Sequence, residues 1–112
     1  MALRIAFEND CGYTDSNAYI RICGLHFNYM TQKGLLEIGV WKDEQARRNG
    51  KKCHSTAAIP LSDTTLYQFG VVRQLKYSDL VDGGRKAAYI NLKKHKILIG
   101  HQVTDLTKAE DC

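Results

Sequence analysis

Four cysteines and four histidines are the side chains of this 112-residue chain that could hold a metal ion. Two pairs are close in sequence, Cys23 with His26 and Cys53 with His54. Structural zinc sites usually place two ligands on one tight turn, with spacings such as Cys-x2-Cys. Both pairs here fall in strand-like segments, where odd offsets put side chains on opposite faces. We therefore predict four free thiols and no bound metal.

Nucleophilic and acid–base catalysis also need partners that the sequence does not supply. Cys53 follows a basic segment, a setting that many loop cysteines share. The carboxylate pairs, Asp10 with Asp15 and Asp79 with Asp82, lie in segments rich in turn-forming residues. Glycine-rich phosphate-binding motifs of the GxxxxGK[ST] and GxGxxG types are missing from the sequence. We predict that the protein is not an enzyme and uses no cofactor and no small-molecule substrate.

A dense basic cluster is the clearest candidate for binding. Arg47, Arg48, Lys51 and Lys52 lie within six positions, and Trp41 precedes them. Cations beside an aromatic ring suit phosphate groups and stacked bases. The same cluster also suits an acidic surface of a protein partner, or plain solvent exposure.

Arg21 is a second candidate contact because it interrupts an apolar strand. It falls on the face opposite Ile20 and Ile22, and a charged group in mid-strand is rarely buried without a partner. We predict that it meets a carboxylate of this chain or of a neighbouring copy, with solvent exposure as the alternative. The predicted partner-contact residues are Arg21, Trp41, Arg47, Arg48, Lys51 and Lys52.

Length and composition are those of one globular domain over residues 1–112: 44% of residues are hydrophobic and 25% are charged. The net charge of +4 permits nucleic-acid binding without requiring it. No apolar run approaches the roughly 20 residues that span a bilayer, and no signal peptide is recognisable. We expect no membrane association, and we expect residues 104–112 to form a flexible tail.

Alternating apolar residues predict strands over residues 3–7, 18–29, 36–40 and 56–61. In the second of these strands the apolar residues change from even to odd positions near Gly24, which predicts a β-bulge. The short link at residues 31–34 predicts antiparallel pairing of the second and third strands. Pro60 predicts that the fourth strand has a free edge or an unpaired amide.

Helix signals are clearest over residues 43–50, where Asp43 can cap the start and Gly50 can end a short corner helix. For residues 64–80 apolar spacing favours a longer helix, and a strand fits almost as well. Residues 85–100 favour a hairpin, with a helix over 85–96 as the alternative. The predicted fold class is α+β and β-rich: an antiparallel sheet, or a small sandwich or barrel, with one short and one longer helix.

Three segments carry a recognisable pattern: Cys11-Gly12-Tyr13-Thr14, Asn17-Ala18-Tyr19-Ile20-Arg21-Ile22, and Gly39-Val40-Trp41-Lys42 continuing to Lys51. Through this pattern, residues 11–61 resemble small virion-associated proteins of tailed bacteriophages. In such proteins a Gly-x-Thr loop leads into an Asn-Ala-Tyr-x-Arg-Ile strand, and a basic corner follows a later strand. The remainder of the chain matches no pattern.

This resemblance implies a structural component of the phage particle, in its tail, neck or baseplate, assembled in the host cytoplasm. Its partners would be other virion proteins and further copies of itself, because such units repeat one interface symmetrically. A nucleic-acid-binding accessory protein that uses the basic loops is the alternative hypothesis.

Overall fold

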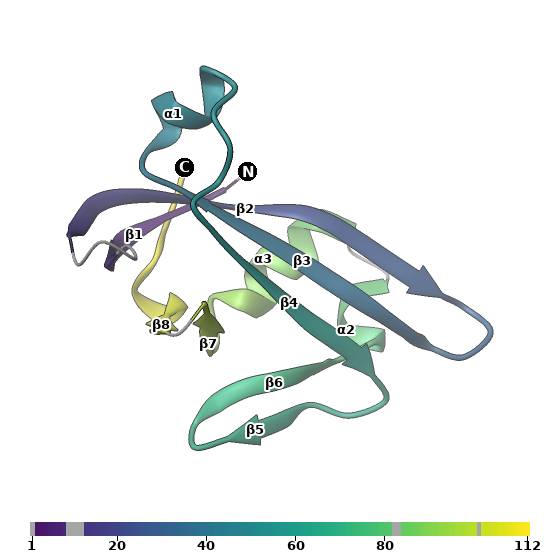
Figure 1. Ribbon diagram of the computed structural model, residues 1–112. Coiled ribbons are helices and arrows are strands. Elements are labelled where there is room, and N and C mark those ends of the chain that lie inside the picture. Colours follow the sequence, from purple (N-terminus) through teal and green to yellow (C-terminus); the bar gives the residue numbers. More distant parts are fainter. Residues whose placement is uncertain (1, 9–12, 82–83, 101) are drawn as a thin grey trace.

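The computed structural model describes residues 2–8, 13–81, 84–100 and 102–112, and it is β-rich with a few short helices. Figure 1 shows a curled sheet that forms a half-barrel, with helices against one side. The elements are β1 (Leu3–Glu8), β2 (Thr14–Asn28), β3 (Lys33–Trp41), α1 (Glu44–Arg48), β4 (Ser55–Ser62), β5 (Leu66–Gln68), β6 (Val71–Lys76), α2 (Ser78–Val81), α3 (Gly84–Leu92), β7 (Lys96–Ile99), β8 (Gln102–Asp105), a 3-10 turn (Leu106–Lys108) and β9 (Glu110–Asp111).

Within the described residues the strands follow the order β8-β7-β6-β4-β3-β2-β1-β9, and β5 pairs with β6 outside this path. Most pairings are antiparallel, while β6 runs parallel to both β4 and β7. Inward-facing residues of β2, β3 and β4 meet α2 and α3 in one hydrophobic cluster. The predicted β-rich α+β class is therefore confirmed.

The long strand β2 carries the bulge that its sequence predicts. Its pairing with β3 shifts between Ile22 and Gly24, which restores Leu25 to the core side. The hairpin between β2 and β3 is antiparallel, as expected. The strand begins at Thr14, earlier than the predicted residue 18, because Thr14 and Asp15 pair with the end of β1.

Tyr89 of α3 completes the backbone hydrogen bonding of β2. The pairing of β1 with β2 ends at Leu3 and Ile20, so the Ile22 N–H lies beyond the reach of β1. That N–H donates to Tyr89 Oη at 2.9 Å, and the Tyr89 side chain is fully buried. A helix thus supplies the acceptor that a buried strand amide needs.

Pro60 lies where the sequence predicts. Strand β4 pairs with β3 from Ser55 to Leu61, but with β6 only at Leu61 and Ser62. Among the described strands, most of β4 therefore has a neighbour on one side only, and a residue without an N–H is tolerated there.

The helix predicted over residues 64–80 is wrong: this segment forms the β5–β6 hairpin followed by the short α2. Phe69 and Gly70 both have positive φ and form the two-residue turn between paired Gln68 and Val71. Gly70 therefore acts as a turn residue, and the β-branched Val71 and Val72 favour the strand that follows.

The hairpin predicted over residues 85–100 is also wrong, and its alternative is closer to the structure. Helix α3 covers the first part and β7 the last part. Ala88, Tyr89 and Leu92 are buried on one face of α3, and the alanines favour helix. The apolar residues that suggested a strand at the end of the segment belong to β7.

The carboxyl-terminal segment, expected to be a flexible tail, is instead tied into the fold. Leu106 is fully buried, and β9 pairs with β1. The backbones of Ala2 and Cys112 exchange two hydrogen bonds of 3.1 and 3.0 Å. A single apolar anchor in a polar segment is a weak sequence signal, which explains the error.

Candidate interaction surface

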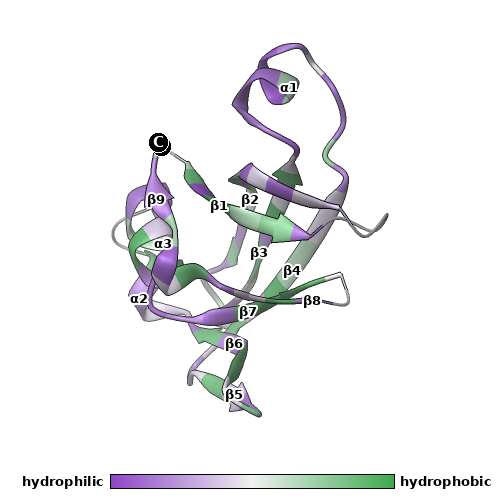
Figure 2. Ribbon diagram, turned by 90° about the vertical axis from the view of Figure 1, so that its left-hand side faces the viewer, coloured by the Kyte–Doolittle hydropathy of each residue, from purple (hydrophilic) through white to green (hydrophobic). Residues whose placement is uncertain are grey.

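Helix α1 and the loop after it form the basic corner, defined here as residues 41–52, which stands apart from the sheet in Figures 1 and 2. Asp43 has extended backbone and its Oδ1 accepts from the Ala46 N–H at 2.7 Å. This is the N-cap contact that the sequence predicts. Glu44 occupies the first turn and Arg48 the last, which complements the helix dipole.

The end of α1 is a Schellman motif. The Gly50 N–H donates to the Arg47 carbonyl at 3.0 Å, and the Lys51 N–H donates to the Ala46 carbonyl at 3.1 Å. Gly50 has a φ of +76°, as this motif requires. The predicted corner helix is thus confirmed at both of its ends.

Trp41 anchors the returning loop rather than presenting a free aromatic face. Its indole N–H donates to the Lys51 carbonyl at 2.8 Å. The ring packs edge-on against Tyr19 and lies over Gly39, where a Cβ would approach it to 3.0 Å. Its role as a partner contact stays a prediction.

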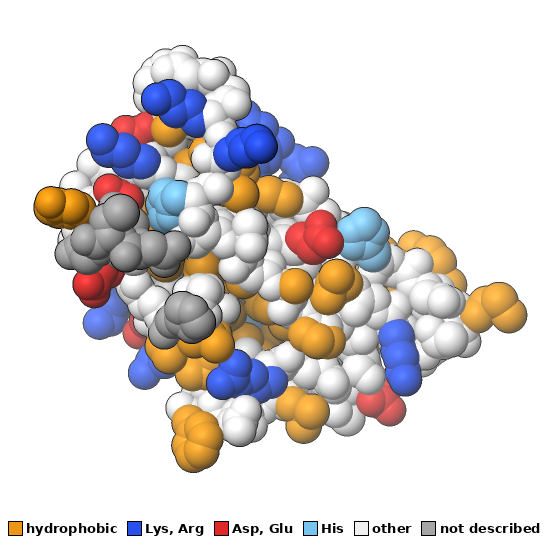
Figure 3. All heavy atoms as spheres, in the orientation of Figure 1, with side chains coloured by type: hydrophobic (Ala, Val, Ile, Leu, Met, Phe, Trp, Pro, Cys, Tyr) orange, Lys and Arg blue, Asp and Glu red, His pale blue; other side chains and the backbone are white. Residues whose placement is uncertain are grey.

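The corner holds cations that the described chain leaves without a carboxylate partner. Arg48 pairs with Glu44 at 2.8 Å, an exposed pair across one helical turn. Within the described residues Arg47, Lys51 and Lys52 make no ion pair, and both lysines are exposed. Figure 3 shows Lys and Arg side chains gathered around this end of the molecule. The corner is therefore a net positive surface on a turn that is capped at both ends.

Arg21 lies on β2 opposite Gly39 of β3 and is partly buried. It makes no ion pair with any carboxylate in the part of the chain that the structure describes, so the predicted partner within this chain is not found there. A carboxylate on a neighbouring copy stays a prediction.

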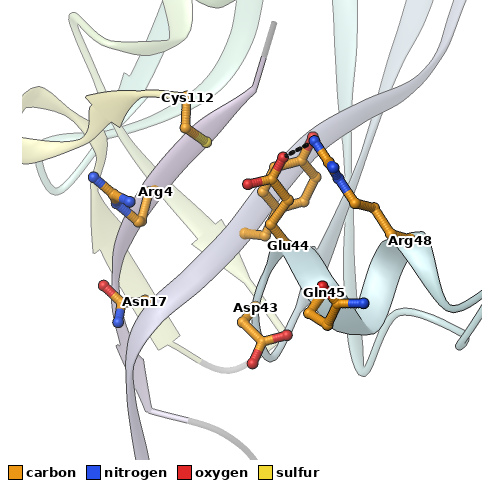
Figure 4. Close-up of a pocket in the computed structure, with 8 residues that line it drawn as sticks. Arg4, Asn17, Asp43, Glu44, Gln45, Arg48 and Cys112 are labelled. Atoms are coloured by element: carbon orange, nitrogen blue, oxygen red, sulfur yellow. Dashed lines mark hydrogen bonds and ion pairs between the residues drawn. The ribbon is translucent and has the colours of Figure 1, made fainter.

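A polar cleft of about 380 Å³ separates α1 from β1 and the carboxyl-terminal residue. In Figure 4 Arg4, Asn17 and Cys112 face Glu44, Gln45 and Arg48 across it. Both arginines already have acidic partners, since Arg4 pairs with Glu110 at 3.0 Å. The cleft therefore offers paired charges and amides, which suit a polar segment of a partner better than a single strongly charged group.

Exposed apolar side chains at two hairpin ends were missed by the sequence reasoning. Met30 at the β2–β3 turn is 96% exposed, and Phe69 at the β5–β6 turn is 94% exposed. Tyr29 and Tyr67, beside these turns, are also exposed. The dipeptide Phe69-Gly70 was the available signal, because a turn there carries the aromatic ring outward.

The cysteine–histidine pairs do not converge on a metal site in the described residues. His26 lies 3.6 Å from a Glu37 oxygen, and His54 lies 3.6 Å from Asp15 and 2.9 Å from Ser55 Oγ. The described cysteines are free thiols, and burial raises the pKa of Cys23. Cys11, Asp10 and Asp82, named above in possible sites, lie outside the described residues.

Comparisons with known proteins give no relative: no family model, no curated protein and no solved structure matches this chain. Among the described residues no helix is long and apolar enough to cross a membrane.

Proposed function

We propose that this protein is a structural component of a tailed-phage particle, in its tail, neck or baseplate, that acts through protein–protein contacts in multiple copies. The observation that carries the proposal is the exposure of large apolar side chains at two hairpin ends, where Met30 and Phe69 meet only solvent in a single copy. Solitary exposed apolar residues are common, whereas contiguous exposed apolar patches mark interaction sites. Each turn here combines its apolar tip with an exposed tyrosine, Tyr29 or Tyr67.

The resemblance of residues 11–61 to virion-associated proteins supports the same function. Of its three segments, residues 17–22 lie in β2 and residues 39–51 run from the end of β3 through α1, so these two build neighbouring strands and the basic corner. The proposal places the protein in the virion after assembly in the host cytoplasm, and assigns it no catalytic role.

The basic corner supplies a test. We expect Arg47→Ala combined with Arg48→Ala to slow co-assembly with particle components, more strongly at low salt, because surface charge steers encounter. Melting should barely change, since the one ion pair lost is exposed. The control is Lys94→Ala with Lys96→Ala, which removes the same charge from another exposed site.

The measurement is the fraction of tagged protein that sediments with particles made in its presence. The same variants are tested for binding to random-sequence DNA across a salt titration. Loss of DNA binding by the corner variant with undiminished incorporation would favour the nucleic-acid alternative. Absence of the wild-type protein from particles would refute the structural role.

A further inference from the structure

Phe69 has a backbone conformation that its side chain does not favour. The turn between Gln68 and Val71 has φ values of +53° at Phe69 and +79° at Gly70, which is the pattern of a type I′ turn. Asn-Gly is the preferred sequence for such a turn, and a bulky residue at positive φ is strained. The Phe69 ring is nonetheless 94% exposed, so nothing within this chain's core compensates for the strain.

An aromatic pocket of about 350 Å³ lies at the other end of the same hairpin. Its apolar wall is formed by Tyr29, Tyr77 and Val81. The ring centroids of Tyr29 and Tyr77 are 6.4 Å apart at 85°, an edge-to-face arrangement. The volume is within the roughly 300–1,000 Å³ of typical ligand pockets, and aromatic walls favour an aromatic guest.

The Phe69 turn and the pocket lie at opposite ends of strand β6. Strand β6 runs from the Phe69 turn to Lys76, and Lys76 and Tyr77 already line the pocket. In Figure 1 the β5–β6 turn lies at the lower left, while α2 and the β2–β3 turn lie at the right. Phe69 therefore cannot fill the pocket of its own chain, but a second copy can present it.

We propose that copies of this protein associate head to tail, with Phe69 of one copy inserted into the Tyr29–Tyr77 pocket of the next. This inference rests on the multi-copy role proposed above. The interface is heterologous, since the two surfaces differ. Contacts of this kind build a ring when the rotation closes and a filament when it does not.

The two surfaces carry side chains of opposite charge, a cation on the hairpin of Phe69 and a carboxylate on the pocket wall. Arg73 is the cation of β6 nearest the Phe69 turn, and it is exposed. Asp63 at the pocket wall is exposed as well, and in the described residues neither side chain makes an ion pair. Insertion of the turn brings Arg73 toward Asp63 of the next copy. Lys76 on the same wall offsets part of the Asp63 charge, so the aromatic contact is the main attraction.

The first test is Phe69→Asn, which gives the turn its preferred sequence. We expect self-association, measured by sedimentation velocity, to weaken by at least about tenfold, as for loss of an interface hot spot. The Tm of the variant should rise by about 2–5 °C because the turn strain is relieved. A purely structural role for Phe69 predicts no loss of association. Val103→Thr, at an exposed position on β8, is the control and should associate like the wild type.

The second test mixes two variants. Phe69→Asn keeps an intact pocket, and Tyr29→Ala keeps an intact turn, so each should be monomeric alone. Head-to-tail insertion predicts that their mixture forms a one-to-one dimer that grows no further. A symmetric contact between two Phe69 turns predicts instead that Tyr29→Ala associates by itself and that Phe69→Asn does not join it. Exchanging the charges by Asp63→Arg with Arg73→Asp should preserve association, while either change alone should weaken it.

A monomeric wild type, undiminished association of Phe69→Asn, or a mixture that stays monomeric would each overturn the inference. These measurements need only the purified chain, so they are independent of particle incorporation. Self-association without incorporation would refute the virion role alone, and incorporation of a monomeric protein would refute the head-to-tail contact alone.

Discussion

Single side chains supply hydrogen-bond partners to backbone groups of this sheet that no neighbouring strand reaches, and Tyr89 is the clearest case. We expect Tyr89→Phe to destabilise the protein by about 1–3 kcal/mol, because the Ile22 N–H would be left buried without an acceptor. Urea unfolding should show a lower midpoint with an unchanged slope. Tyr67→Phe is the control, since Tyr67 is 56% exposed and water can replace its contact. Equal effects of the two changes would contradict this assignment.

His95 should make stability depend on pH. Burial, and then the nearby Lys94, lower the pKa of His95 below its ordinary value of 6.5. Between the folded-state pKa of His95 and 6.5, the unfolded chain binds more protons than the folded chain. The free energy of unfolding therefore falls as the pH drops through this window. The contribution of neutral His95 to stability is fully present above the window.

The check is a comparison of wild type with His95→Gln by urea unfolding at several pH values. The variant should lose the part of the pH dependence that lies just below pH 6.5. A slope that is the same in both proteins would assign the effect to other groups.

At the scale of an element, α1 depends on its caps because none of its residues is buried. We expect Asp43→Ala to destabilise the corner by about 0.5–2 kcal/mol, since the Ala46 N–H loses its acceptor. Hydrogen exchange at Ala46 should accelerate. Asp43→Ser retains a capping oxygen and should exchange nearly as slowly as the wild type. Unchanged exchange in Asp43→Ala would show that the sheet, rather than the cap, holds the corner.

Elements with local signals could be predicted from the sequence. The bulge at Gly24 and the helix caps at Asp43 and Gly50 each depend on residues that are only a few positions apart in the sequence. The hairpin that carries Phe69 was harder to predict, because the apolar spacing of residues 64–80 fits both a helix and a strand and the turn signal rests on Gly70 alone. The same holds for the candidate surfaces. The basic corner could be predicted because its residues are neighbours in the sequence. The aromatic pocket could not, because it brings Tyr29 after β2 together with Tyr77 after β6.

At the scale of the whole molecule, the two ends of the chain share one sheet edge. Strands β1 and β9 pair, Arg4 meets Glu110 at 3.0 Å, and Lys93 meets Asp111 at 3.2 Å. These ion pairs are at least partly exposed and contribute little. The firm attachment is Leu106, which is fully buried in the same cluster as Leu3 and Ile20. The terminal segment is therefore held mainly by Leu106, with the smaller Ala109 in the same cluster.

Leu106→Ala should consequently destabilise the entire protein, by about 2–5 kcal/mol, because it leaves a cavity in the common core. Trp41 fluorescence and far-ultraviolet circular dichroism should shift together, since Trp41 packs on Tyr19 of the strand that carries this core. Glu110→Ala with Asp111→Ala, which removes both terminal ion pairs and keeps Leu106, should change stability by less than about 1 kcal/mol. Two separate transitions in Leu106→Ala, with only circular dichroism affected at first, would mean that the terminal segment folds as an independent unit.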